Sequence, residues 1–330
     1  MTKSMQLLLA GLIDYAGMHA PAKLSLRDSL RNYVEYTNGD KKWMLSRFVL
    51  PHYEIPNLAH FADKSHRLHG PLSISVTTTP TLTVEKFMTV IRELENVVLH
   101  AHSQYPGELR TDVLEITLPS ESIASSNHEP LIKAIQFAVS RMAENRLLPK
   151  RIYFEIPDFV FDAKILRVVM KAIALHNKTI QKKKIDNYLF SGFKLRCGGN
   201  DSSQYPNSGY ISDSMIYARD ANVAIKFSDG LRNPFRDFDI NLAIPTQGFI
   251  NVICAGLLSY AQDLVRDEMV EILNDESYKS FRFTNEYMSW KDLAIPVNEL
   301  KMLRMLSLTS IGSSSFDIPV EELYRLRLIS

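Results

Sequence analysis

The stretch Phe-Lys-Leu-Arg-Cys-Gly-Gly at residues 193–199 has the pattern of a short buried strand that contains a lysine and ends at a glycine. A second stretch of this kind, Ile-Lys-Phe-Ser-Asp-Gly at residues 225–230, places Lys226 32 residues after Lys194. Lysine is rare in strands that are buried on both faces. The spacing fits consecutive parallel strands joined by a helix. The two stretches therefore predict a βαβ unit whose lysines share one pocket.

The same alternation of short apolar runs and longer segments of 3.6-residue period extends along the chain. The predicted strands are residues 8–15, 45–50, 72–78, 113–118, 151–156, 193–197, 223–227 and 308–312. The predicted helices are residues 25–36, 83–102, 131–143, 162–176, 212–220, 249–265 and 320–328. Ser25 and Thr83 are suited to cap two of these helices.

Eight strands that alternate with helices predict an α/β protein with a (β/α)8 TIM barrel. A doubly wound open sheet is the alternative, although no Gly-x-Gly-x-x-Gly motif opens a helix. Residues 266–306 do not fit one βα unit, and the stretches 281–283 (Phe-Arg-Phe) and 288–290 (Met-Ser-Trp), which flank Asn285 and Glu286, predict a β-hairpin. We expect a single barrel domain over residues 1–330, with residues 266–306 inserted between strands seven and eight.

The composition is that of an ordinary globular protein, with 330 residues, 45% hydrophobic and 23% charged. The net charge of +1 argues against nucleic-acid or membrane partners. Two cysteines are too few for a disulfide framework, so we expect a cytoplasmic protein. No spacing of residues predicts a metal or another cofactor. The apolar run at residues 5–13 is interrupted by Asp14 and predicts a first strand rather than a signal peptide.

Alternate residues of a barrel strand point inward, and barrel sites lie at the carboxyl ends of the strands. This rule predicts an inward-facing polar set of Asp14, Arg47, Glu115, Glu155, Lys194, Arg196, Lys226 and Ser228. Because buried charges are costly unless they are paired, the set is open to interpretation as an internally neutralised network. We favour a functional pocket for a small anionic substrate, because apolar side chains would fill the same volume at a lower desolvation cost.

Two neighbouring lysines allow nucleophilic catalysis. A lysine must be neutral to attack a carbonyl carbon and form an imine, but its usual pKa is about 10.4. A second ammonium at about 4 Å, with an effective dielectric constant of about 20, disfavours the charged form by about 4 kcal/mol. We therefore expect Lys194 or Lys226 to be a nucleophile whose pKa the other lysine lowers. Asp14, Glu115 or Glu155 would transfer protons at the imine.

The last predicted strand ends in a turn that is suited to an anion. Gly312, Ser313 and Ser314 precede the final helix, and a helix N-terminus presents backbone N–H groups to negative charge. Phosphates often bind after strands seven and eight of barrels, so Gly230 and Ser228 are candidates for the other half of the site. An ordinary serine-rich turn is the alternative.

These motifs resemble deoxyribose-phosphate aldolase and the class I aldolases. In that family the lysine of strand six forms the Schiff base, the lysine of strand seven perturbs it, and the final glycine–serine turn helps to bind phosphate. The resemblance assigns these roles to Lys194, Lys226 and the turn formed by Gly312, Ser313 and Ser314. Arg196 departs from the family, which usually has a small hydroxyl residue there. Glu115 is the candidate counterpart of the family's aspartate on strand four.

A pattern over nearly the whole chain is similar to that of an uncharacterised bacterial family of barrel-like proteins. Its segments here are residues 12–17 (Leu-Ile-Asp-Tyr-Ala-Gly), 47–51, 194–199, 226–234, 248–251 and 312–319. Members often carry two histidines where this chain has Arg232 and Asn233. This resemblance implies no activity.

Three hypotheses follow. The first is a Schiff-base, aldolase-like lyase acting on a small carbonyl compound, phosphorylated or not, with Arg47, Arg196 and the 312–314 turn holding anionic groups. The second is an isomerase or dehydratase on the same barrel, in which the lysines only bind an anion. The third is a non-catalytic binding or scaffold barrel. In that case the hairpin around Trp290 is a candidate contact surface in a homo-oligomer, and its other interpretation is a lid.

Overall fold

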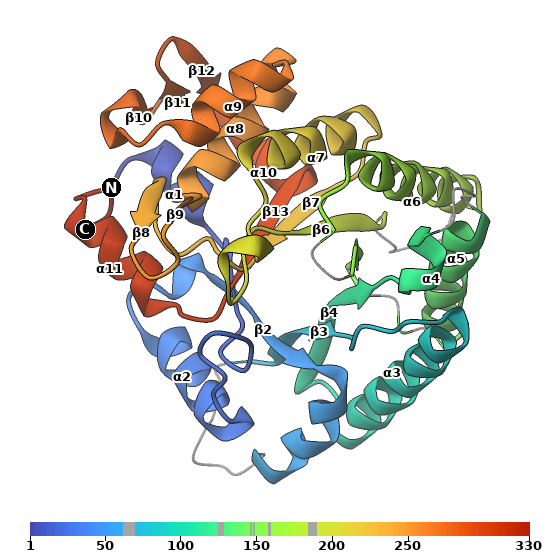
Figure 1. Ribbon diagram of the computed structural model, residues 1–330. Helices are drawn as coiled ribbons and strands as arrows, with labels where there is room; N and C mark the ends of the chain where they lie inside the picture. The colour runs from blue at the N-terminus through green and yellow to red at the C-terminus, as the bar shows by residue number, and fades with distance from the viewer. Residues whose placement is uncertain (62–69, 125–128, 146, 148, 158–159, 184–189) are drawn as a thin grey trace.

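The computed structural model is a closed barrel of eight parallel strands surrounded by helices (Figure 1). It describes residues 1–61, 70–124, 129–145, 147, 149–157, 160–183 and 190–330. The barrel strands, in chain order, are β1 (Ile13–Tyr15), β2 (Leu45–Pro51), β3 (Leu72–Thr77), β4 (Leu109–Thr117), β5 (Arg151–Glu155), β6 (Gly192–Arg196), β7 (Ile225–Ser228) and β13 (Leu308–Ser313). Strand β13 pairs with both β7 and β1, which closes the barrel. The predicted (β/α)8 fold is confirmed.

Helices on the outside of the barrel connect these strands. They are α2 (Leu26–Asn38), α3 (Val84–Gln104), α4 (Ser120–Ala124), α5 (Glu129–Glu144), α6 (Ala163–Lys183), α7 (Ser208–Asp220), α8 (Phe249–Gln262) and α11 (Asp317–Arg325). Ser25 caps α2 by accepting a hydrogen bond from the amide of Asp28, and Thr83 caps α3 in the same way. Both predicted caps are therefore present.

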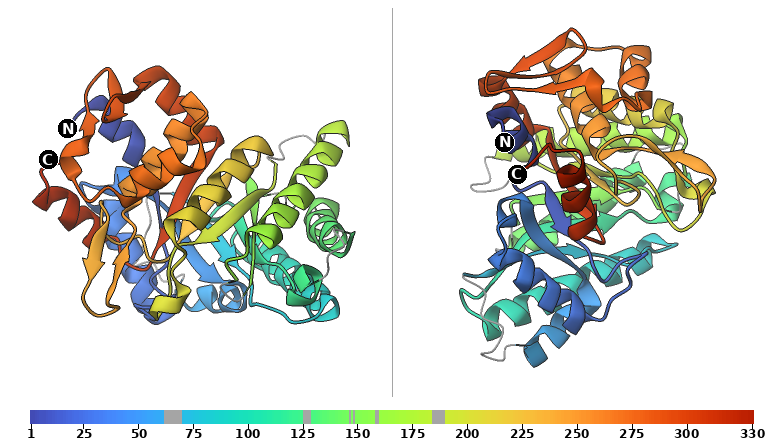
Figure 2. Two further views of the ribbon diagram at one scale, coloured as in Figure 1. Left: turned by 45° about the horizontal axis from the view of Figure 1, so that its top comes forward. Right: turned by 90° about the vertical axis from the view of Figure 1, so that its left-hand side faces the viewer.

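The connection from β7 to β13 is the longest and carries the additional elements. A small hairpin of β8 (Asp237–Asp239) and β9 (Ile244–Thr246) follows β7 directly and was not predicted. After α8 come α9 (Arg266–Asn274), the antiparallel strands β10 (Phe281–Phe283), β11 (Tyr287–Trp290) and β12 (Leu293–Pro296), and α10 (Val297–Leu306). The expected hairpin is present as β10 and β11, and it gains a third strand. Figure 2 shows this group beside the barrel, next to the N-terminus.

The N-terminal segment differs from the prediction. Residues 8–15 were predicted as one strand, but helix α1 (Lys3–Leu9) precedes a strand of only three residues. The buried residues Met5, Leu8 and Leu9 recur at intervals of three and four, which is the spacing of a helix face. The apolar run is thus the buried side of a helix that packs near α10.

The apolar core lies between the strands and the outer helices. Outward-facing side chains such as Phe193, Leu195 and Phe227 are almost fully buried in this layer. The interior of the barrel instead holds polar and charged side chains, among them the fully buried Asp14 and Lys226. Among the described residues, no helix is long and apolar enough to cross a bilayer.

Candidate functional site

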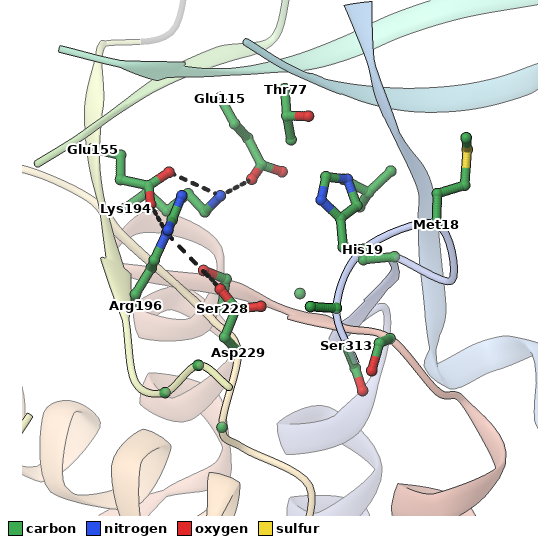
Figure 3. Close-up of a pocket in the computed structure, with 18 of the residues that line it drawn as sticks. Met18, His19, Thr77, Glu115, Glu155, Lys194, Arg196, Ser228, Asp229 and Ser313 are labelled. Carbon is green, nitrogen blue, oxygen red and sulfur yellow. Dashed lines mark hydrogen bonds and ion pairs between the residues drawn. The ribbon is translucent and has the colours of Figure 1, made fainter. Parts of the chain in front are cut away.

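A cavity of about 390 Å³ opens at the carboxyl ends of the barrel strands (Figure 3). Nine of the residues predicted from the sequence line it: Glu115, Glu155, Lys194, Arg196, Ser228, Gly230, Gly312, Ser313 and Ser314. The register explains this convergence, because Glu155 is aligned with Lys194 on the neighbouring strand, and Arg196 with Ser228 on the next. Inward-facing residues of neighbouring strands therefore meet at two adjacent levels of the barrel.

Lys194 is the lysine that lines this cavity, although its side chain is only 8% exposed. Its Nζ lies 2.8 Å from Oε2 of Glu115 and 3.0 Å from Oε2 of Glu155. Burial lowers the pKa of Lys194, but the two carboxylates outweigh burial and raise the pKa above its ordinary value. In this arrangement Lys194 is an ammonium ion at neutral pH.

Lys226 lies beneath the cavity and is fully buried. Its Nζ is 2.5 Å from Oδ2 of Asp14, and it also donates to Glu115. Burial alone would lower the pKa of Lys226, but these carboxylates raise it. Burial likewise opposes ionisation of Asp14, whose pKa is nevertheless lowered by Lys226 and by Arg47. The Lys226–Asp14 pair is thus a buried, compensated ion pair below the cavity.

The expected repulsion between the two lysines is not what sets their protonation. The lysines are aligned on neighbouring strands as predicted, but Glu115 lies between their ammonium groups and accepts from both. The hydroxyl of Ser75 also donates to Glu115, at 2.6 Å. A carboxylate between two cations favours the charged form of each, so the predicted lowering of a lysine pKa is wrong for this arrangement.

Arg196 extends the charged network along the rim of the cavity. Its guanidinium bonds to Glu155, and its Nε lies 4.0 Å from Oδ2 of Asp229. Asp229 directly follows β7 with a left-handed backbone (φ 57°). Burial raises the pKa of the Asp229 carboxyl above its usual value. A non-glycine residue in this backbone region is uncommon and typical of functional sites.

Arg47 is a predicted site residue that the structure places at the opposite mouth of the barrel, and Asp14 and Lys226 also do not line the cavity. Arg47 is the third residue of the seven-residue strand β2, so it lies toward the amino end of the barrel. There it lines a different cavity, while its Nη1 bonds to Oδ1 of Asp14 at 3.4 Å. The expected contact of Arg47 with a substrate at the carboxyl ends is therefore wrong. Alternation predicts that a residue points inward, but it does not give its height along the barrel axis.

The glycine–serine turn after β13 lies at the cavity as predicted, but some of its hydroxyl groups already form hydrogen bonds within the same segment. Ser313 Oγ donates to the carbonyl of Ser315 at 2.6 Å. Ser315 Oγ accepts from the amide of Ile318 in the first turn of α11. Asp317 at the start of the helix accepts from the hydroxyl of Tyr36 at 2.5 Å. Binding of an anion by this turn stays a prediction.

His19 lines the cavity and was not predicted as a site residue. It follows β1 in the loop toward Pro21, and Figure 3 shows its ring across the cavity from Lys194 and Arg196. Within the described part of the chain its buried Nε2 has no hydrogen-bond partner. Burial, then the nearby charge of Lys194, lowers the pKa of His19 to about 4. The imidazole is therefore neutral at pH 7, and its Nε2 is free to bond to a ligand. No motif in the sequence indicates that His19 belongs to the site.

Cys197, one residue after Arg196, is fully buried in the outer core and does not line the cavity. Burial raises the pKa of its thiol, which excludes a reactive thiolate at neutral pH. The described residues also contain no group of three or more histidine, cysteine or acidic side chains arranged to hold a metal ion.

The fold and the site together define a (β/α)8-barrel protein with an ionic cavity at the carboxyl ends of its strands. No protein-family model matches the sequence, and no curated protein matches it. Among solved structures, the chain is similar to a Bacteroidetes-affiliated GH5 cellulase linked with a polysaccharide utilization locus. That match has 9% identity and a TM-score of 0.41, and it covers 98% of this chain and 97% of that chain. A likeness at this level says nothing about the reaction.

Proposed function

We propose that this protein is a Schiff-base enzyme of the class I aldolase type that acts on a small carbonyl compound carrying an anionic group. The observation that supports this most is the position of Lys194. It is the lysine that reaches the cavity, and its Nζ lies within 3.0 Å of two carboxylates that also line the cavity.

The carboxylates around Lys194 suit the charge of the proposed intermediate. An imine formed at Nζ becomes a cationic iminium once it is protonated, so its positive charge lies where the ammonium charge was. Glu115 and Glu155 already stabilise a cation at this point, and they need no reorganisation to stabilise the iminium. The same carboxylates are within reach of the proton that the ammonium must lose before it attacks.

Lys226 and Asp14 have supporting roles in this proposal. Neither lines the cavity, and both are fully buried. Asp14 accepts from Lys226 and from Ser310, at 2.5 and 2.8 Å. Proton transfer to the substrate therefore falls to Glu115 and Glu155. Lys226 holds Glu115 in place from below and helps to keep it ionised, since the charges of Lys194 and then of Lys226 outweigh burial and lower the pKa of that carboxyl.

Other residues that line the cavity are suited to hold the anionic group of the substrate. Arg196 and Arg232 both line it, together with Ser228, Gly230 and the Gly312–Ser313–Ser314 turn. The volume of about 390 Å³ fits a small molecule. A phosphate or carboxylate on such a molecule would be bonded by guanidinium, hydroxyl and backbone N–H donors.

The second candidate function is an isomerase or dehydratase in which Lys194 only binds an anion. The raised pKa of Lys194 supports this candidate, because a lysine that stays charged attracts anions but does not attack carbonyls. A scaffold without a ligand is less well supported, because the charged network leaves an open cavity.

Reductive trapping separates these functions. The protein is treated with borohydride and a panel of small aldehydes, ketones and sugar phosphates, and the intact mass is then measured. We expect a mass gain of substrate size in the wild type and in Lys133→Met, an exposed lysine on α5. We expect its loss in Lys194→Met and its retention, at a lower rate, in Lys226→Met. An adduct that persists in a folded Lys194→Met protein would sink the proposal.

A further inference from the structure

A second cavity, of about 350 Å³, lies at the amino-terminal mouth of the barrel. Part of its wall comes from residues just before or at the beginning of strands: Gly11 before β1, Arg151 at the start of β5 and Thr309 near the start of β13. Helices α1 and α10 supply another part of the wall. Five basic side chains line it: Arg47, Lys150, Arg151, Lys301 and Arg304. Among its described lining residues there is no aspartate or glutamate. The charge of this mouth is therefore strongly positive in a chain whose net charge is only +1.

Only part of this positive charge is compensated. Arg47 pairs with Asp14, and Lys150 Nζ lies 3.2 Å from Oδ1 of Asp112. Arg151 donates to the carbonyl of Leu306 at 3.4 Å. Within the described residues, no carboxylate lies within 4.0 Å of Arg151, Lys301 or Arg304. Three cations at the mouth thus lack an anionic partner.

Arg304 makes this excess unusual because it is only 7% exposed. Its guanidinium donates to carbonyl oxygens alone, at Leu8 and Ala10 before β1 and at Leu308 and Thr309 in β13. Burial lowers the pKa of Arg304 to about 10, so it remains charged at neutral pH. These bonds hold α1 and β13 together, but dipoles do not neutralise a buried charge.

Arg47 adds an unused donor. Its Nη1 bonds to Asp14 and to Ser46, whereas its buried Nε has no hydrogen-bond partner in the described part of the chain. A buried N–H group without an acceptor is costly, and Arg47 is one of the residues that line the cavity. Beside the cations, the apolar side chains of Leu7 and Met305 line the same cavity.

We propose that the amino-terminal mouth of the barrel is a second ligand site, which binds a small phosphate-bearing molecule between Arg47, Arg151, Lys301 and Arg304. Guanidinium and ammonium donors that converge from β2, β5 and α10 suit a tetrahedral oxyanion with acceptors on every side. The apolar wall leaves room for an organic group attached to the phosphate. This site is separate from the cavity that holds Lys194.

The two sites are linked by a continuous series of charged contacts. We call the amino-terminal mouth the lower mouth or lower site, and the cavity at the carboxyl ends of the strands the upper cavity. Arg47 at the lower mouth bonds to Asp14, and Asp14 bonds to Lys226. Lys226 in turn bonds to Glu115, which bonds to Lys194 at the upper cavity. An anion at the lower site adds negative charge near this series and competes with Asp14 for Arg47. We therefore expect a bound phosphate to raise the pKa of Lys194 further, which gives the lower site a regulatory effect on the upper one.

Calorimetric titration with inorganic phosphate, at constant ionic strength, tests the site. We expect binding by the wild type, and affinity weakened at least about tenfold, or about 1.4 kcal/mol, in Arg151→Gln/Lys301→Gln, which leaves the structural Arg304 intact. The matched control is Lys164→Gln/Lys171→Gln, which removes two exposed lysines from a basic cavity on α6. Arg196→Gln, which changes the upper cavity, should retain the phosphate binding that Arg151→Gln/Lys301→Gln weakens. Unchanged affinity in Arg151→Gln/Lys301→Gln, or no binding by the wild type at millimolar phosphate, would overturn the proposal.

Trace acetylation of Lys194, followed by peptide mass over a range of pH, tests the link. Below its pKa, the rate at which Lys194 is acetylated follows the fraction of its neutral amine. We expect phosphate to lower this rate at each pH in the wild type but not in Arg151→Gln/Lys301→Gln. Phosphate binding at the amino-terminal mouth without a lower rate would overturn the regulatory part. Neither measurement depends on Schiff-base chemistry, so a failed borohydride test and a failed phosphate test are distinguishable.

Discussion

Lys194 and Lys226 are chemically alike in the sequence but differ in what they contact. Lys194 lines the upper cavity, while Lys226 is fully buried beneath it. The sequence places both on neighbouring strands, but it does not show that Glu115 reaches between them from β4, which is separated from β6 by β5. Sequence reasoning therefore identified the residues of the network and predicted the wrong direction for the lysine pKa. The pKa values of the lysines are raised because Glu115 lies between the two ammonium groups.

The raised pKa of Lys194 makes a prediction about pH. The amine is the reactive form, and below the lysine pKa its fraction rises about tenfold for each unit of pH. We expect the rate of imine trapping, measured with cyanoborohydride at a fixed carbonyl concentration, to increase in this way from pH 7 to pH 9. A rate that is already constant above pH 7 would mean that Lys194 is neutral there, and it would contradict the charge arrangement described above.

At the scale of the elements, hydrophobic period and caps predicted most of the barrel. Short apolar runs predicted strands β2 to β7, and Ser25 and Thr83 predicted the caps of α2 and α3. At these positions the folded structure agrees with the local sequence preference. Helix α1 was missed because a short apolar run has no clear period, and a helix and a buried strand are then hard to tell apart. Arg47 was placed at the wrong mouth because alternation gives the face of a strand but not the level.

The loop after β7 depends on Gly230. Its φ is +67°, and a Cβ there would lie 2.4 Å from the carbonyl oxygen of Cys197 in the loop after β6. We expect Gly230→Ala to lower the free energy of unfolding by about 1–3 kcal/mol from backbone strain alone. The clash between the alanine Cβ and the backbone of Cys197 should lower it further. Urea unfolding measures this loss. Gly39→Ala is the matched control, because Gly39 has an ordinary φ of −79° and its Cβ would lie 3.6 Å from the nearest atom. Equal stability of the two variants would contradict the tight approach of the loops.

At the scale of the whole molecule, the ionic interior makes stability depend on pH. The pKa of His19 is about 4 in the folded protein, below its usual value, so the unfolded chain binds a proton first. Stability should therefore fall as the pH decreases from about 6.5 to about 4. The pKa values of Asp14 and Glu115 are also lowered, so their contribution is lost only below about pH 4. The raised pKa of Asp229 acts in the opposite direction.

Urea unfolding over this range of pH checks the expectation of two successive losses. His19→Gln should reduce the first loss and leave the second, because the imidazole of His19 contributes between about pH 4 and 6.5, whereas Asp14 and Glu115 contribute below about pH 4. Part of the first loss should remain, since burial also lowers the pKa of His52 and His102. A first loss of the same size in His19→Gln would show that His19 is not the neutral, buried group that lines the cavity.

The sharing of Glu115 between two lysines also constrains how such a sequence can change over generations. A single substitution that removes one charge from the series between Arg47 and Lys194 takes one partner from each neighbouring charge and leaves a net charge buried in the barrel, which costs up to about 3–5 kcal/mol. A second substitution that removes the opposite charge restores neutrality. Descendants of this chain should therefore exchange these residues in neutral pairs, such as Lys226 together with Asp14, and hardly ever one at a time.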